Sequence, residues 1–114
     1  MSDLSKQRME YYVPAVRAVL VELAKAGETM TYEALQAKLG GPGRGYIGQV
    51  LSDICIEEQS AGRPLLTSII VRKQSGDPGP GYWALPMTKS TPIDQRASAL
   101  KAEQLRVSAY WRNH

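Results

Sequence analysis

The sequence predicts an α+β fold that is mainly helical, a winged helix-turn-helix with an extra C-terminal helix. Three observations lead to this prediction. Apolar residues recur at helical spacing in several segments, a glycine-rich turn separates two of those segments, and an apolar β-branched run follows them directly. The 114 residues are of single-domain size and long enough to bury a core without disulfides or metals. We therefore expect residues 1–114 to form one winged-helix domain.

The first predicted element is a helix over residues 9–26. Its apolar residues recur every three or four positions, and Gly27 fits its end. Pro14 costs least in the first turn of a helix, where its missing N–H needs no partner. Residues 9–12 are therefore expected to form a loose lead-in.

Two further helices are predicted over residues 31–39 and 44–61. Thr31 is typical of a helix N-cap, and a pair of glycines ends the helix that it starts. The stretch GGPGRG is interpreted as a turn, because consecutive glycines with a proline are costly inside a helix. Apolar residues then recur at helical spacing up to Gly62.

A β-hairpin over residues 65–85 and a helix over residues 92–112 complete the prediction. The run LLTSIIV would be apolar on both faces of a strand, GYWAL would be its partner, and QSGDPGP would be the tip of the wing. Thr91, Pro92 and Asp94 supply three helix-start signals, an N-cap, a proline in the first position and an acid in the first turn.

Composition excludes several classes of function. Cys55 is the single cysteine and His114 the single histidine, so we expect neither a disulfide nor a metal site, and no cofactor. No segment has the pattern of a signal peptide or the length of a membrane span, which favours a cytoplasmic protein with no membrane contact. The net charge of +3 comes from residues 86–114, with five basic and two acidic side chains. A basic tail helix fits a phosphate backbone and a solvated face equally well.

Residues 28–83 contain a series of residues whose order and spacing resemble those of a known family. The series is Met30-Thr31-Tyr32, Leu35, Leu39-Gly40, Pro42, Ile47-Gly48, Leu51, Ile69-Ile70-Val71 and Gly81-Tyr82. This series resembles the DNA-binding domain of O6-alkylguanine-DNA alkyltransferases and alkyltransferase-like proteins. The resemblance implies a winged helix-turn-helix that lies in the minor groove of DNA. In that family a tyrosine helps to rotate a base out of the duplex, an arginine fills the gap, and a cysteine takes the alkyl group.

The match is good at one of these three positions. Tyr32 matches the base-rotating tyrosine, whereas the arginine position falls on Gly45, with Arg44 one residue earlier. Thr67 stands in the place of the reactive cysteine, and neither the histidine nor the arginine of the family's motif follows it. A threonine without a neighbouring general base is a poor nucleophile. We therefore expect a binding protein and no enzyme.

No other catalytic group is expected. Cys55 lies on the apolar side of its helix and is interpreted as a core residue. Asp53, Glu57 and Glu58 are interpreted as a solvated acidic face. The stretch GDPGPG has neither the lysine nor the following helix of a phosphate-binding loop.

The leading hypothesis is a DNA-binding protein, acting as a regulator or in a defence system or mobile element. Its helix over residues 44–61 would present its first half to a groove, and its wing would meet the backbone. The predicted contact residues are Tyr32, Arg44, Tyr46, Gln49, Ser52, Arg63, Arg72 and Lys73.

The alternative hypothesis is a protein–protein interaction module, a dimerising adaptor or an inhibitor, on the same scaffold. Residues 28–85 carry no basic excess. Aromatic residues lie near the ends of elements and are either hot spots for a partner or large core residues, namely Tyr11, Tyr12, Tyr82, Trp83, Tyr110 and Trp111. A homodimer or protein partner would use the first and C-terminal helices.

Overall fold

The computed structural model describes the backbone of residues 3–41 and 44–114 and the side chains of residues 9–41 and 46–114. The described chain is mainly helical with a small two-stranded sheet, which confirms the predicted class. The elements are α1 (Asp3–Ala26), β1 (Met30–Thr31), α2 (Tyr32–Leu39), α3 (Arg44–Ser60), η1 (Leu66–Ile69), β2 (Ile70–Val71), α4 (Pro80–Trp83), η2 (Ile93–Gln95) and α5 (Arg96–Arg112). None of the described helices is both long enough and apolar enough to cross a membrane.

The predicted hairpin over residues 65–85 is wrong. Residues 66–69 form a 3₁₀ helix, β2 pairs with β1 in parallel, and residues 80–83 form the short helix α4. The reason is burial, because every residue from 65 to 70 is buried, which leaves this segment no exposed face of the kind a wing presents. Pro78 and Pro80 also lack the N–H that a second strand would donate. The winged helix is therefore not confirmed.

Two helix starts also differ from the prediction. α1 begins at Asp3 and includes Pro14 in its interior, so residues 9–12 are helical and not a lead-in. Pro14 is exposed, where the lost backbone hydrogen bond can be replaced by water. The signals at residues 91–94 lead into the 3₁₀ helix η2, a tight turn common at helix N-termini, and α5 itself begins at Arg96.

Other local signals act as expected. The Thr31 hydroxyl caps α2 by accepting a hydrogen bond from the Ala34 amide at 3.1 Å. Gly40 ends α2 in the left-handed region with φ 70°.

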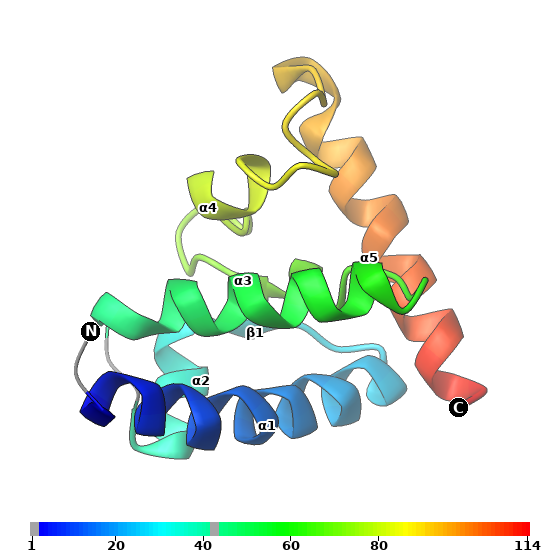
Figure 1. The fold of residues 1–114 in the computed structure, drawn as a ribbon. Coiled ribbons are helices and arrows are strands. Elements are labelled where there is room, and N and C mark those ends of the chain that lie inside the picture. The colour runs from blue at the N-terminus through cyan, green and yellow to red at the C-terminus, as the bar shows by residue number, and fades with distance from the viewer. Residues whose placement is uncertain (1–2, 42–43) are drawn as a thin grey trace.

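The core lies between α1, α3 and the buried segment that contains η1 and β2 (Figure 1). In that view α3 lies above α1, and α5 crosses the right-hand ends of both helices. Fully buried side chains come from every one of these elements, and include Val16, Leu20, Ile54, Leu66, Ile70 and Val107. A second cluster joins α3 to α4 and the first half of α5 through Cys55, Leu65, Tyr82, Trp83, Leu85 and Leu100.

Glu58 corrects the interpretation of the acidic stretch as a solvated face. Its side chain is 0% exposed and forms ion pairs with Arg17 of α1 and with Arg63, just beyond α3. Glu58 stands four residues after Ile54, so helical spacing turns it toward the core. The Arg63 guanidinium in turn lies 6.0 Å from the ring centroid of Trp111 on α5. One buried carboxylate thus connects three helices.

Replacing Glu58 by glutamine should lower the free energy of unfolding by about 2–4 kcal/mol, because two arginines lose their counter-charge in a partly buried place. Urea unfolding followed by circular dichroism measures this change. Glu57→Gln is the matched control, since the Glu57 side chain is 52% exposed and approaches Arg17 only to 3.7 Å. Its effect should stay within about 0.5 kcal/mol. Equal effects of the two variants would contradict the role assigned to Glu58.

Candidate nucleic-acid interface

Two hollows meet at Tyr32, the first residue of α2. The inner one is a cavity of about 50 Å³ between α3, η1 and the segment around α4. The outer one is a groove of about 370 Å³ between α2, the first half of α3 and the loop that follows β2. Both are lined by Tyr32, Gly48, Pro78 and Gly81. These four residues therefore form the wall between the cavity and the groove.

The wall is closed by a hydrogen bond. The Tyr32 hydroxyl donates to the backbone carbonyl of Pro78, which lies 46 residues further along the chain. The half-buried position of Tyr32 raises the pKa of its phenol, and the nearby positive charge of Arg72 opposes that rise. The phenol is therefore neutral at physiological pH and able to donate.

The sheet register brings Tyr32 and Arg72 to the groove together. Thr31 pairs with Val71, so the next residue of each strand leaves the sheet at the same edge. Gly79 leaves room for the Arg72 side chain at the groove. A Cβ at Gly79 would stand 2.8 Å from Arg72 Nε, and Gly79 has φ 98°, so the guanidinium lies against bare backbone.

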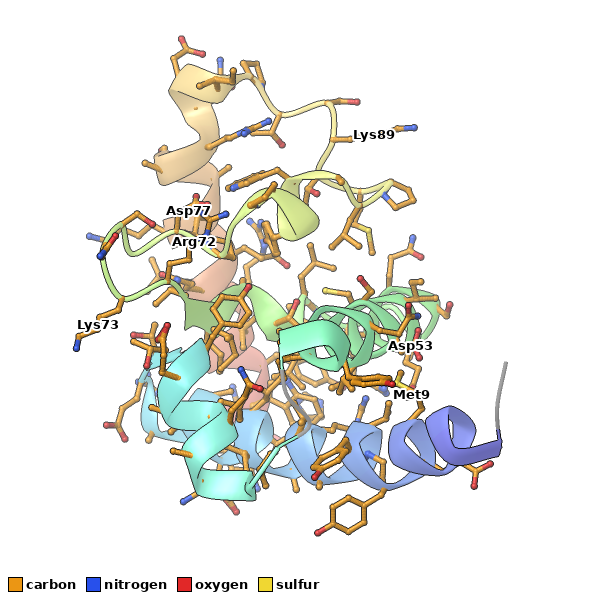
Figure 2. The ribbon with its side chains drawn as sticks, turned by 90° about the vertical axis from the view of Figure 1, so that its left-hand side faces the viewer. Met9, Asp53, Arg72, Lys73, Asp77 and Lys89 are labelled. Atoms are coloured by element: carbon orange, nitrogen blue, oxygen red, sulfur yellow. The ribbon has the colours of Figure 1, made fainter. Side chains whose placement is uncertain are left out.

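Asp77 organises the loop between β2 and α4, a role that the sequence analysis missed. Its backbone carbonyl accepts from the Arg72 amide at 2.9 Å, and its carboxylate accepts from the Gly79 amide at 2.7 Å and from Trp83 Nε1 at 2.9 Å. Figure 2 shows Asp77 beside Arg72, with Lys73 pointing away from the loop into solvent. The sequence Asp-Pro-Gly is a turn signal in which an aspartate bonds its own backbone two residues on, and it was the clue to this role.

Cys55 and Thr67 form the floor of the inner cavity. Cys55 is fully buried, as predicted for a core residue, and its Sγ lies 2.6 Å from Thr67 Oγ1. Burial raises the pKa of the Cys55 thiol, and the hydrogen bond with Thr67 partly opposes that rise. The thiol is therefore protonated at neutral pH, and the Thr67 hydroxyl is paired with it and not with a general base.

The remaining predicted contact residues lie along α3 and just beyond its end. Gln49 is exposed beside the groove and donates to Asp53 at 3.2 Å, Ser52 lines the inner cavity, and Tyr46 is half-buried near the start of the helix. The Arg44 side chain lies outside the described residues. Arg63 lies at the far end of α3, where it is held by Glu58.

No protein-family model, curated protein or solved structure matches the chain at a significant level. The resemblance to alkyltransferases therefore rests on the residues quoted for it above. Among the described residues, no group of three or more histidine, cysteine, aspartate or glutamate side chains could hold a metal ion.

Tyr32→Phe should lower the free energy of unfolding by about 1 kcal/mol, because the buried Pro78 carbonyl loses its hydrogen-bond donor while the ring stays in place. Urea titration measures the change. Tyr11→Phe serves as the control, since Tyr11 is 63% exposed, and it should change stability by less than about 0.5 kcal/mol. An unchanged stability of Tyr32→Phe would show that the bond to Pro78 does not hold the loop.

Stability should decrease at alkaline pH. Burial raises the pKa of Cys55 above the ordinary value of 9.0, and that of Tyr32 and Tyr82 above 10.0. Above about pH 9 the unfolded chain loses these protons before the folded chain does, so the stabilisation is complete below that pH and is lost as the pH rises through the folded-state values. Urea titrations between about pH 8 and 11 measure the slope. Cys55→Ala removes one of the groups and should make the decrease shallower; a steeper decrease would contradict this assignment.

Proposed function

We propose that this protein binds duplex DNA without catalysing a reaction, and that it does so with the groove at Tyr32. The observation that carries this proposal is the placement of Arg72. Its guanidinium lies against the backbone of Gly79 and lines the groove together with the first half of α3. Beside the N-terminal half of a recognition helix, a cation such as Arg72 is well placed to contact a phosphate of the DNA backbone. The side chains of that half of the helix then face the bases.

The contact residues that support this proposal come from two sides of the groove. Gln49 supplies an exposed amide from α3, of the kind that pairs with adenine. Lys73 extends from the loop into solvent (Figure 2). There it is available to contact the phosphate backbone of a DNA duplex docked on the groove. Arg63 is not part of the proposed surface, because its guanidinium is paired with Glu58, which lies about three helical turns along α3 from the groove.

The charges around the groove limit how deep DNA can dock. Glu33 lines the groove from α2, and Asp53 follows Gln49 by one turn on α3. Both carboxylates would repel phosphates that approached beyond the first half of α3. We therefore propose shallow docking, with few phosphate contacts and a correspondingly weak affinity.

The inner cavity is too small, in this closed form, to accept a base rotated out of the duplex. Base rotation is the role that the resemblance implies for Tyr32. A volume of about 50 Å³ has room for a few water molecules. A nucleobase would enter only after the bond between Tyr32 and Pro78 broke and the loop moved outward. Our proposal is therefore limited to duplex binding in the closed form.

The alternative, a dimerising protein–protein interaction module, has less support. The apolar faces of α1 and α5 pack against each other, with Val107 and Trp111 in contact with the α1 side of the core. Large exposed apolar side chains lie on four different elements, as Tyr11, Ile56, Ile93 and Leu105. The two helices expected to bind a partner thus already cover each other.

Fluorescence anisotropy with a labelled DNA duplex at several salt concentrations tests the proposal. With two or three phosphate contacts, the plot of log K against log salt should have a slope of about −2 to −3. Arg72→Ala and Lys73→Ala should each weaken binding severalfold and reduce that slope by about 1.

Lys89→Ala is the matched control, since Lys89 is an exposed lysine between α4 and η2, well away from Lys73 in Figure 2. Its binding curve and salt slope should equal those of the unaltered protein. Absence of binding at low salt would overturn the DNA proposal and favour the interaction module. Equal losses for Lys73→Ala and Lys89→Ala would show diffuse charge attraction without a defined interface.

A further inference from the structure

Another hollow lies at the opposite end of the molecule from the cavity and groove at Tyr32. It is a cleft of about 460 Å³ between the end of α1, the turn at residues 27–29 and one face of α5. In Figure 1 this is the right-hand side, where the end of α1 approaches α5, whereas α2 lies at the left. The volume falls within the range of small-molecule sites. Apolar atoms of Ala24, Ile69 and Ala109 form part of its lining.

Polar groups of α5 converge at one point of this cleft. Ser108 and Arg112 stand four residues apart, and therefore on the same face of the helix. Ser108 Oγ lies 3.4 Å, and an Arg112 guanidinium nitrogen 2.8 Å, from the position that a Cβ at Gly27 would occupy. Gly27 has φ 70° and carries no side chain there, so the hydroxyl and the guanidinium lie together against its bare backbone.

These groups lack partners within the described part of the chain. Ser108 Oγ is buried and makes no hydrogen bond, an arrangement that lowers the stability of the fold. Arg112 forms no ion pair with a described residue, and neither does Lys101, which lines the cleft two turns before Ser108.

The one acidic residue of α5 cannot neutralise this face. The Glu103 carboxylate accepts from the Leu65 amide at 2.7 Å and pairs with Arg106. One carboxylate oxygen of Glu103 thus binds the buried segment at Leu65, and the other binds Arg106. Glu103 therefore does not neutralise Lys101 or Arg112.

We infer that this cleft is a binding site for a phosphate monoester. The Arg112 guanidinium and the Ser108 hydroxyl provide donors of the kinds that bind phosphate oxygens, and the Lys101 ammonium, about three turns away along α5, adds positive charge to the same cleft. The apolar walls leave room for the organic part of the ligand. Glu28 also lines the cleft, and its carboxylate opposes an anion and weakens the site.

Isothermal titration calorimetry on the full chain tests this site with adenosine monophosphate, inorganic phosphate and adenosine. The two phosphate compounds should bind and adenosine should not. Arg112→Gln should weaken binding at least tenfold, whereas Arg106→Gln, an arginine on another face of α5, should leave it unchanged. Equal binding by these two variants, or no binding of either phosphate compound, would overturn the assignment.

Two further variants separate binding from folding. Ser108→Ala should keep or raise the thermal midpoint, because it removes a buried hydroxyl without a partner, and yet weaken phosphate binding about tenfold. Glu28→Gln should strengthen binding severalfold, a gain that misfolding cannot produce. A lowered thermal midpoint with unchanged phosphate affinity for Ser108→Ala would overturn the role of its hydroxyl, and unchanged affinity of Glu28→Gln would overturn the electrostatic argument.

The phosphate group has two possible sources, a free small molecule or the end of a nucleic acid strand. A single-stranded oligonucleotide with a 5′-phosphate, compared with the same strand ending in a 5′-hydroxyl, distinguishes them. A tenfold preference that Arg112→Gln abolishes assigns the site to strand ends, and equal binding assigns it to small molecules. Lys73→Ala should leave phosphate binding intact, so a failure of the DNA proposal and a failure of this one give different results.

Discussion

Glu58 lies where three helices meet, and its carboxylate determines how they meet. A fully buried charge is tolerated in a protein when its partners are close and well placed, so α1 has to present Arg17 and the end of α3 has to present Arg63. Arg63 also lies over Trp111, which carries the constraint on to α5. The 3₁₀ helix η1, in the buried segment from residue 65 to 70, packs against the same helices α1, α3 and α5. The ion-pair network therefore helps to hold together the helices on which η1 and β2 pack.

The smallest element of the fold has the largest effect on the candidate interface. A sheet of two residues per strand contributes little hydrogen bonding, but its register decides which side chains leave its edge together. A shift of one residue would place Arg72 on the opposite face from Tyr32. The groove is thus specified by long-range packing around β2, while the loop that carries Arg72 is specified locally by Asp77 and Gly79.

The features that could be predicted from the sequence were those with local causes. Helical spacing, the Thr31 cap and the burial of Cys55 depend on neighbours within a few positions, and the structure bears them out. The hairpin failed because an apolar run has the same pattern in a central parallel strand as in a covered antiparallel one. The prediction that Glu58 lies on a solvated face was wrong for a related reason. Its partner Arg17 lies about forty residues away, and no local pattern indicates that pairing. Within the candidate interface, Tyr32 was predicted from a family resemblance, whereas the position of Arg72 against Gly79 could be known only from the fold.

The parallel pairing of β1 with β2 also has a consequence for the order of events during folding. Met30 and Ile70 meet across a long stretch of chain, so their contact closes a large loop and carries a high entropic cost. The helices can begin to form from local contacts, but the groove cannot exist until β2 is held between α1, α3 and α5. A chain still emerging from the ribosome, with α5 not yet made, would have its helices without its interface. The groove therefore forms late in folding, together with the completed core.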